Sequence, residues 1–405
     1  MNVVYERCCG MDVHKKMIVA CFRTGKQQEM RQFGTSTKEL RNMAEWLEQG
    51  ECQMVAMEST GSYWKPIYNV LELLGLEVMV VNAQHMKAVP GRKTDTKDAA
   101  WIADLLQHGL LKASFIPNRE QRELREVSRY RKSLVEERSR EINRLEKMLE
   151  GANIKLSSVV SNLMGMSSLN LIRASMAGEL SEATIDGMIY GKLHPKRDEL
   201  LAAMDGVLSS AQRMLVGAVL DHISDMTRRI EDIGSIIRIE MQKYEDAITA
   251  LDAIPGIGVQ SAQTILAEIG IDMSRFPTAA HLASWAGVCP GNHESAGKRK
   301  SGRTCKGNKT LKTTLVQCAK TAAKTKDTFF RAQYDRLTVR RGANRATLAV
   351  AHSMLIAIYH MLKTNQPFRD LGGRYYNQFN AEKKINAYLK KLNDLGWSPP
   401  VTAAN

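Results

Sequence analysis

The stretch GMDVHKK at residues 10–16 decides how the N-terminal part of this chain is expected to fold. Its first four residues belong to an extended segment, 9–13, and a β-rich run, MIVACF at 17–22, follows it directly. Segments of this kind, a few residues apart, are typical of neighbouring strands. Residues 29–33 are expected to add a third strand to the same meander, and residues 3–5 also have an extended pattern.

Helices and strands alternate through the rest of this region. Ser36 and Glu39 have the spacing of a capping box, and Gly50 is expected to close the helix that follows. The next expected elements are a strand at 53–57, a helix at 64–74, a strand at 77–81 and a helix at 94–107. Three strands followed by alternating helices and strands are the order of an RNase H-like α/β fold, which we expect over residues 1–115.

Four carboxylates occupy positions in this fold that suit a metal site. They are Asp12 in GMDVHKK, Glu58 in AMESTGSYW, and Asp95 and Asp98 in KTDTKDA. The first and fourth strands are neighbours in the fold, and a spacing of three residues puts both aspartates of KTDTKDA on one helix face. The four groups can therefore converge at one sheet edge.

Carboxylates in such an arrangement are the ligands that Mg²⁺ or Mn²⁺ takes together with phosphate oxygens and water. Two such ions can stabilise both oxygens of a phosphodiester displacement. Lys93 flanks the aspartate pair and is a candidate phosphate contact, and His14, beside two lysines, is interpreted as a hairpin residue or phosphate neighbour. Each acid taken singly is an ordinary strand-end or helix-start residue, so the prediction rests on the combination.

Two long helical patterns follow the α/β region. Residues 119–150 are densely charged, contain no proline and predict one long helix with a poor coiled-coil register. Apolar residues from 219 to 237, continuing to 251, recur at alternating spacings of four and three. Such a stripe is typical of a helical hairpin or a coiled coil, or of a core stripe in a monomeric bundle. Residues 116–250 are thus expected to form a helical, coiled-coil region.

The C-terminal region, 251–405, is expected to be mostly α-helical and to bind nucleic acid. Its first segment, LDAIPGIGVQSAQTILAEIG at 251–270, has the form of a helix–hairpin–helix. Gly256 and Gly258 permit the tight turn, whose amides offer donors to a phosphate. The alternative is a helical hairpin whose glycines serve packing alone.

A glycine-rich basic loop follows and contains the candidate nucleophile Ser295. A serine hydroxyl is a weak nucleophile that needs activation, and Ser284 and Ser301 are rival candidates. The basic side chains expected to contact nucleic acid are Lys298, Arg299, Lys300, Arg303, Lys306 and Lys309. Between residues 291 and 345 the chain has 15 Lys and Arg against 3 Asp and Glu, which accounts for most of the net charge of +14.

Composition narrows the class of protein. A basic chain of 405 residues fits a polyanionic partner, nucleic acid or an anionic membrane surface. The N-terminus has no signal-peptide pattern, and the uncharged stretch 346–362 is short for a membrane span, so we expect a buried helix there and no membrane partner. Seven cysteines without a CxxC pair favour a reducing cytosol over a zinc site or disulfides.

These motifs together resemble one family. GMDVHKK, AMESTGSYW, RKTDTKDA, the IPGIG turn and ASWAGVCPGNHESAGKRKSGRTCKGN look like the two halves of the IS110-type insertion-sequence transposases, also called DEDD transposases or bridge recombinases. The resemblance spans the whole chain. It implies a RuvC-like N-terminal domain whose tetrad, matched here by Asp12, Glu58, Asp95 and Asp98, binds Mg²⁺.

The resemblance also implies a covalent mechanism and a set of partners. The family's C-terminal domain supplies a serine, matched by Ser295, that forms a 5′-phosphoserine link to DNA. A noncoding bridge RNA pairs with donor and target DNA, and the protein acts as a tetramer, a dimer of dimers, in the bacterial cytosol near the nucleoid. No helix-turn-helix, zinc finger or GxxxxGK[ST] loop stands in the sequence, which agrees with guidance by RNA and with strand exchange without ATP.

Two other functions remain open from the residues alone. A junction-resolving nuclease would hydrolyse DNA through metal-activated water, and Ser295 would then be merely polar. A nucleic-acid-binding scaffold would use its acids only structurally. The sequence leaves open the guide RNA, the DNA sites, the number of metals, the split of basic residues between RNA and DNA, and the role of residues 365–405.

Overall fold

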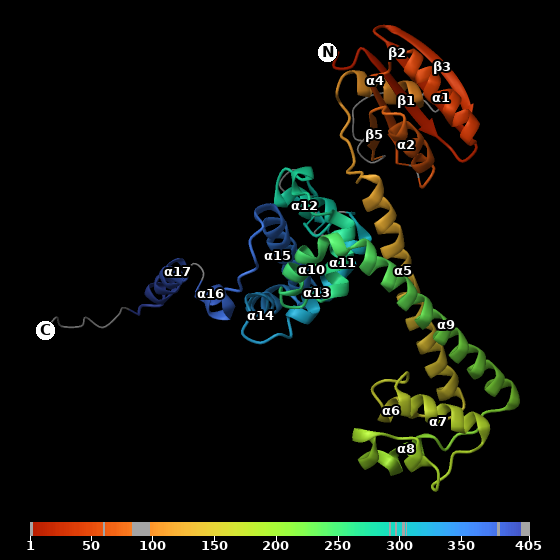
Figure 1. Ribbon diagram of the computed structural model, residues 1–405. Helices are drawn as coiled ribbons and strands as arrows, with labels where there is room; N and C mark the ends of the chain where they lie inside the picture. Colours follow the sequence, from red (N-terminus) through yellow and green to blue (C-terminus); the bar gives the residue numbers. More distant parts are fainter. Residues whose placement is uncertain are drawn as a thin grey trace. The chain divides into compact units, whose positions relative to one another are not determined.

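The computed structural model describes residues 3–59, 61–82, 98–290, 293–295, 298–301, 304, 306–378 and 381–397, with backbone only at 293–295, 298–301, 377 and 381–384. The chain divides into two compact units, Met1–Pro117 and Asn118–Asn405 (Figure 1). The first break therefore lies two residues beyond the expected one, and the division of the second region at residue 250 stays a prediction.

The first unit is built on a five-stranded mixed sheet. Its described elements are β1 (Arg7–Val13), β2 (Met17–Thr24), β3 (Gln27–Gly34), α1 (Thr37–Gln49), β4 (Met54–Glu58), α2 (Trp64–Leu73), β5 (Val78–Val81) and α4 (Asp98–Gln107). The strands lie in the order β3-β2-β1-β4-β5. The β1–β2 and β2–β3 pairs are antiparallel, and the β1–β4 and β4–β5 pairs are parallel. The expected meander and the alternation after it are confirmed, whereas residues 3–5 lie outside the sheet.

Apolar layers cover both faces of this sheet. On one face, Met11 and Met57 pack with residues of α1 and α2, including Met43 and Ile67. On the other face, Ala56 and its neighbours pack with α4. Because side chains alternate along a strand, the two apolar sets come from alternate positions of the same strands.

The capping box expected at the start of α1 is only half formed. The Ser36 hydroxyl accepts a hydrogen bond from the Glu39 amide at 3.4 Å, so Ser36 is the N-cap. The Glu39 carboxylate instead accepts from the Gly34 amide at 3.4 Å, because the last residue of β3 offers its amide there. Gly50 closes the helix as expected, and a Cβ at this position would lie 2.8 Å from the Phe22 ring.

The second unit begins with a helical hairpin. The long helices α5 (Arg119–Gly151) and α9 (Ser210–Glu240) pack against each other (Figure 1). The shorter elements between them are α6 (Leu156–Val159), α7 (Met166–Ala177), the 3-10 turns η1 (Ile185–Gly187) and η2 (Gly191–Lys196), and α8 (Arg197–Ala203). One apolar core joins these elements to the end of α5 and the start of α9. The hairpin interpretation of the apolar stripe is thus confirmed within one chain.

The remaining elements form a largely helical region. They are η3 (Gln242–Tyr244), α10 (Glu245–Asp252), α11 (Val259–Ile269), η4 (Met273–Arg275), α12 (Ala279–Ala286), β6 (His293–Ser295), β7 (Lys298–Ser301), α13 (Lys309–Ala322), α14 (Phe329–Arg341), α15 (Ala343–Thr364), α16 (Gly372–Gln378) and α17 (Ala381–Asp394). The stripe expected to continue from 237 to 251 is interrupted after Glu240, where η3 separates α9 from α10.

Helix α15 is the centre of this region. It packs on α12, α13 and α14, and the Tyr359 hydroxyl donates to the Phe276 carbonyl at 3.0 Å. The buried helix expected at 346–362 is confirmed. By length and composition alone α15 could also cross a membrane, but half of its apolar window is buried inside the protein, and no other helix in the described ranges meets that test.

Candidate functional site

Two of the predicted carboxylates lie side by side at one edge of the sheet. Met11 of β1 pairs with Met57 of β4 in parallel register. Asp12 and Glu58 are the next residues on these strands, and Glu58 is the last residue of β4. In a parallel pair, opposite residues point to the same face, so Asp12 and Glu58 project from the same side of the sheet at its carboxyl edge.

That side is the one covered by α4. Asp12 and Glu58 alternate with Met11 and Met57, which belong to the core under α1 and α2. The helix α4 begins at Asp98, whose Oδ1 atom is shielded from solvent. Three of the four predicted acids therefore come from β1, β4 and the start of α4 on one face of the sheet.

Gly10 allows α4 to approach this face closely. A Cβ at Gly10 would lie 2.2 Å from the amide nitrogen of Ala103 and 2.5 Å from the carbonyl oxygen of Ala99. Only glycine fits between the strand and the helix backbone at such separations. Gly10 stands two residues before Asp12, and Ala99 follows Asp98, so this contact brings the two acidic segments together.

His14 contacts the first of these carboxylates. Its Nε2 atom lies 3.0 Å from Oδ2 of Asp12, and the two side chains are 59% and 25% exposed. The sequence interpretation, a hairpin residue or phosphate neighbour, did not include this contact. The signal was present, since residues two apart in an extended strand share one face.

The donor set suits a hard divalent cation. Carboxylate oxygens are the ligands that Mg²⁺ prefers, and Asp12, Glu58 and Asp98 supply them from one edge. Within the described ranges, no three His, Cys, Asp or Glu side chains are grouped closely enough to hold one ion. Asp95 and Lys93 lie outside the described residues, so three of the four predicted acids are placed and the fourth stays a prediction.

The candidate nucleophile lies in a β-hairpin of the second unit. In this hairpin, β6 pairs with β7 in antiparallel register, and Ser295 stands opposite Lys298 next to the turn. The side chains of Ser295, Lys298, Arg299 and Lys300, and all of Arg303, lie outside the described residues. Their roles stay predictions.

The base of this hairpin is held closely. Pro290 and Thr304 form an antiparallel bridge, and the Asn308 amide donates to the Trp285 carbonyl at 3.2 Å. A Cβ at Gly307 would lie 2.4 Å from the amide nitrogen of Gly287, so the incoming and outgoing chains touch backbone to backbone. Two predicted nucleic-acid contacts, Lys306 and Lys309, are exposed beside this base.

A buried ion pair contacts Asn308, next to the base of the hairpin. Glu268 at the end of α11 is 1% exposed. Its Oε1 accepts from Nε of Arg129 at 2.7 Å, and its Oε2 accepts from Nη2 of Arg129 at 2.8 Å and from Nδ2 of Asn308 at 2.6 Å. Nε of Arg125 lies 3.5 Å from the same carboxylate. Sequence patterns did not predict this cluster, because Glu268 lies 143 positions from Arg125 and 139 positions from Arg129.

The two arginines respond differently to this burial. Burial lowers the pKa of Arg125 to about 10, although the Glu268 charge opposes the shift. The hydrogen bonds that Arg129 donates to Glu268 raise the pKa of its guanidinium. Both guanidinium groups are therefore charged near neutral pH, and together they balance the buried carboxylate.

Helices α10 and α11 lie on the two sides of the turn expected within 251–270 and pack on each other, and the helix–hairpin–helix interpretation stays a prediction. Gly256 has a φ of +88°, and a Cβ there would lie 2.5 Å from the Cys318 carbonyl of α13. Gly258 has a φ of −109°, and a Cβ there would meet nothing within 4 Å. Glycine at 256 thus has a packing role, whereas Gly258 is exposed at the start of α11. Phosphate contact by either stays a prediction.

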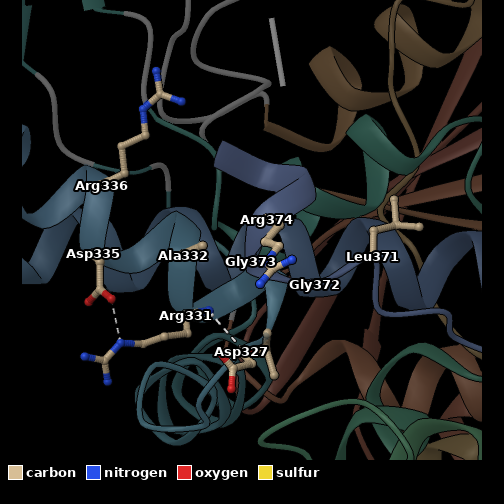
Figure 2. A pocket seen from close by; sticks show the side chains of 10 residues that line it. Asp327, Arg331, Ala332, Asp335, Arg336, Leu371, Gly372, Gly373 and Arg374 are labelled. Carbon is tan, nitrogen blue, oxygen red and sulfur yellow. Dashed lines mark hydrogen bonds and ion pairs between the residues drawn. The ribbon is translucent and has the colours of Figure 1, made fainter. Parts of the chain in front are cut away.

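The segment whose role the sequence left open packs on α14. Phe368 stacks on Phe330 at 5.8 Å, and the Tyr376 ring meets Phe329 edge to face at 4.9 Å. Between α14 and α16 lies a cavity of about 790 Å³ whose lining includes Arg331 and Asp335 (Figure 2). These two side chains point toward each other and form an ion pair at 2.7 Å. None of the predicted site residues lines it.

Comparisons with known proteins agree with the two-part organisation. Residues 9–154 match the model of a family described as "Transposase", the DEDD type of IS110, and residues 248–335 match "Transposase IS116/IS110/IS902 family". The first match contains all four predicted acids, and the second contains Glu268 and the hairpin with Ser295.

Curated relatives extend over most of the chain. A "Probable family 20 transposase" of Pseudomonas aeruginosa is 24% identical over 89% of this chain and 94% of its own length. The transposase for insertion sequence element IS1111A of Coxiella burnetii is 24% identical over 78% of this chain and 79% of its own. An IS110 protein of Streptomyces coelicolor is 26% identical, over 68% and 72%. With both halves matched, this chain belongs to the IS110-type family of insertion-sequence transposases.

Proposed function

We propose that this transposase cuts and rejoins DNA through a covalent bond between Ser295 and a 5′-phosphate, with Asp12, Glu58, Asp95 and Asp98 as a divalent-metal site. The observation that carries the proposal is the shared position of Asp12, Glu58 and Asp98 on the α4 face of the sheet. Carboxylates from three elements on one face of the sheet offer the oxygen ligands that a hard divalent cation takes, which supports a metal site there.

The proposed chemistry conserves phosphodiester bonds. The Ser295 hydroxyl oxygen attacks the scissile phosphorus, the new P–O bond forms to serine, the P–O3′ bond breaks, and the serine proton passes by way of water to the departing O3′. The 3′-hydroxyl of the strand to be joined then attacks the same phosphorus, the P–O bond to serine breaks, and the proton of that hydroxyl passes by way of water to the serine oxygen. Mg²⁺, when held by the acids, supplies stabilisation of the charge that develops on the phosphate oxygens.

The chain's own basic residues hold the DNA in this reaction. Lys306 and Lys309 are exposed at the base of the Ser295 hairpin, where they can meet phosphates on either side of the cut. Lys93, Lys298, Arg299, Lys300 and Arg303 are proposed to act in the same way.

We further propose that a noncoding bridge RNA selects the donor and target DNA and that the active assembly is a tetramer. Pairing between RNA and DNA would supply sequence specificity and leave backbone contacts to the protein. The surplus of basic residues between 291 and 345 supports this division. The reaction would take place in the cytosol, where the DNA is.

A covalent-trapping experiment tests the proposal. The protein, its flanking noncoding RNA, Mg²⁺ and labelled donor and target DNA are mixed and run on a denaturing gel. We expect a protein–DNA adduct in the wild type and in Ser301→Ala, a control on the same hairpin. The adduct should disappear in Ser295→Ala, in Asp12→Asn and without RNA.

Other outcomes identify the alternatives. Free cleaved DNA that persists in Ser295→Ala but is lost in Asp12→Asn would mean a metal-dependent nuclease. DNA binding that ignores Mg²⁺, with no cleavage in any variant, would mean a scaffold.

A further inference from the structure

A buried polar cluster lies next to the base of the Ser295 hairpin and takes no part in the proposed chemistry. The cluster consists of Glu268 of α11, Arg125 and Arg129 of α5, and Asn308, the N-cap of α13, the helix that follows the hairpin. A buried carboxylate is expensive unless it is paired and hydrogen-bonded. Glu268 meets that requirement with three hydrogen bonds, two from Arg129 and one from Asn308, and with the Arg125 charge at 3.5 Å.

Asn308 connects the hairpin to this cluster through both ends of its amide. Its Oδ1 atom accepts from the Leu311 amide at 3.0 Å and so caps α13. Its Nδ2 atom donates to Glu268 at 2.6 Å, and its backbone amide donates to the Trp285 carbonyl at 3.2 Å. One residue thus ties the outgoing strand of the hairpin to α11, α12 and α13.

Side chains of α5 also contact the segments that hold the base of the hairpin. The Arg125 guanidinium lies 5.5 Å from the centre of the Trp285 ring and donates to the backbone of Ala267 and Glu268. Gln121 donates to the Ala267 carbonyl at 3.3 Å, and Lys132 donates to the Thr310 carbonyl at 3.2 Å. Their spacing puts these α5 side chains on one helix face, so α5 holds α11, α12 and α13 together.

We propose that Glu268 and Asn308 are positioning residues for the reaction of Ser295: the buried carboxylate fixes Asn308, and Asn308 fixes the base of the hairpin that carries the nucleophile. The inference rests on the proposed function for its chemical consequence. Its structural consequence, a hairpin held by Glu268, does not depend on that function.

Three variants test the hydrogen bond between Asn308 and Glu268, called the tie below, separately from the capping of α13. Asn308→Ser keeps an oxygen that can cap α13 but removes the amide that reaches Glu268. Asn308→Asp also keeps the cap and sets a second carboxylate against Glu268. Combining Asn308→Asp with Glu268→Gln restores one donor and one acceptor across the contact. Asn118→Ser is the matched control, because Asn118 caps α5 in the same way and is exposed.

Two readouts, the rate of adduct formation and amide hydrogen exchange, are measured on the full-length protein with its RNA and DNA. The DNA dissociation constant is measured beside them as a control. The rate of adduct formation should fall roughly tenfold or more in Asn308→Asp, since small misplacements of a reacting group have effects of this size. The DNA dissociation constant should stay within about twofold, which a general loss of folding would not allow. Amide hydrogen exchange in peptides spanning 288–306 should accelerate, and the double variant should recover both readouts.

The outcomes separate the inference from the proposed function. Wild-type adduct rates in Asn308→Asp and Asn308→Ser would overturn the positioning role. If the wild type forms no adduct, the proposed function fails, and hydrogen exchange decides alone. Faster exchange in Asn308→Asp, recovered in the double variant and absent from Asn118→Ser, would then uphold the tie, whereas unchanged exchange would reject it.

Discussion

Single residues set the geometry of the carboxylate edge. Gly10 has no side chain, and for that reason α4 can lie against β1 with backbone atoms in contact range. Asp12 stands two residues further along β1, and its Oδ2 atom lies 3.0 Å from Nε2 of His14, which follows the end of the strand. A glycine that resembles ordinary strand filler in the sequence thus determines the distance between two acidic segments.

Replacing Gly10 with alanine tests this role. The added Cβ would overlap the backbone of Ala99 and Ala103, so we expect Gly10→Ala to destabilise the first unit by about 1–3 kcal/mol or more and to lower strand cleavage. Thermal unfolding and the trapping gel measure the two effects. Gly151→Ala is the control, because a Cβ there meets nothing within 4 Å. A Gly10→Ala protein as stable and active as the control would refute the close approach.

His352 on α15 makes stability depend on pH. Burial lowers the pKa of this imidazole below its ordinary value of 6.5. As the pH falls through 6.5 the unfolded chain binds a proton before the folded chain does, so this contribution is present above pH 6.5 and is lost below it. We expect the unfolding midpoint of the wild type to drop more between pH 7.5 and 5 than that of His352→Gln. Parallel curves would contradict the assignment.

Individual helices depend on local features that can be tested separately. Helix α9 starts with a complete capping box, in which the Ser209 hydroxyl accepts from the Gln212 amide and the Gln212 side chain accepts from the Ser209 amide. The α10–α11 turn instead depends on a contact with α13. The first feature is local in sequence, and the second is tertiary.

The α9 cap predicts a small loss of stability. Ser209→Ala leaves the Gln212 amide at the helix start without its partner, so unfolding should become easier by about 1 kcal/mol. Urea denaturation measures this change. Ser235→Ala, in the interior of the same helix, removes a bond to the Glu231 carbonyl and an exposed bond from Arg238, and it should be nearly neutral because alanine favours the helix. Equal losses of unfolding free energy in both variants would contradict a specific contribution from the cap.

The two turn glycines of the α10–α11 hairpin separate packing from DNA contact. Gly256→Ala combines a positive φ with a clash against α13 and should lower the unfolding midpoint. Gly258→Ala clashes with nothing, so it should leave stability unchanged while weakening DNA binding if the α11 amides meet phosphate. Thermal unfolding and DNA titration distinguish the two. Unchanged DNA affinity in Gly258→Ala would favour the packing-only interpretation of the turn.

At the scale of the whole molecule, charge is concentrated in one part of the chain. Most of the net charge of +14 lies between residues 291 and 345, in the region of the Ser295 hairpin, α13 and α14. The acids of the candidate metal site lie in the other unit. Binding of DNA should therefore depend strongly on salt through the second unit.

Salt dependence gives a quantitative test of this distribution. Lys309→Ala should weaken DNA binding and reduce the slope of log K against log salt concentration by about one. Lys147→Ala removes the same charge from an exposed site on α5 outside the predicted contacts and should leave the slope unchanged. Equal slopes for the two variants would show that position does not matter and that only net charge does.

The first unit was largely predictable because its signals are local. Strand and helix order, the caps at Ser36 and Gly50, and the edge positions of Asp12 and Glu58 follow from patterns within a few residues. The stripe on α9 predicted a helical partner, but periodicity could not say whether that partner was α5 of the same chain or another molecule. The roles of Ser295 and Asp95 rest on the family resemblance, since their side chains lie beyond the described residues.

By itself, the sequence determined the order of elements, the spacing of the acids and the concentration of basic charge. Only the tertiary structure decided that α5 pairs with α9, that Gly256 packs on α13, and that Glu268 joins Arg125, Arg129 and Asn308. The physical reason is range. Periodicity and capping depend on neighbours within one or two turns, whereas a buried ion pair joins residues 139 positions apart and exists only after the intervening helices have packed.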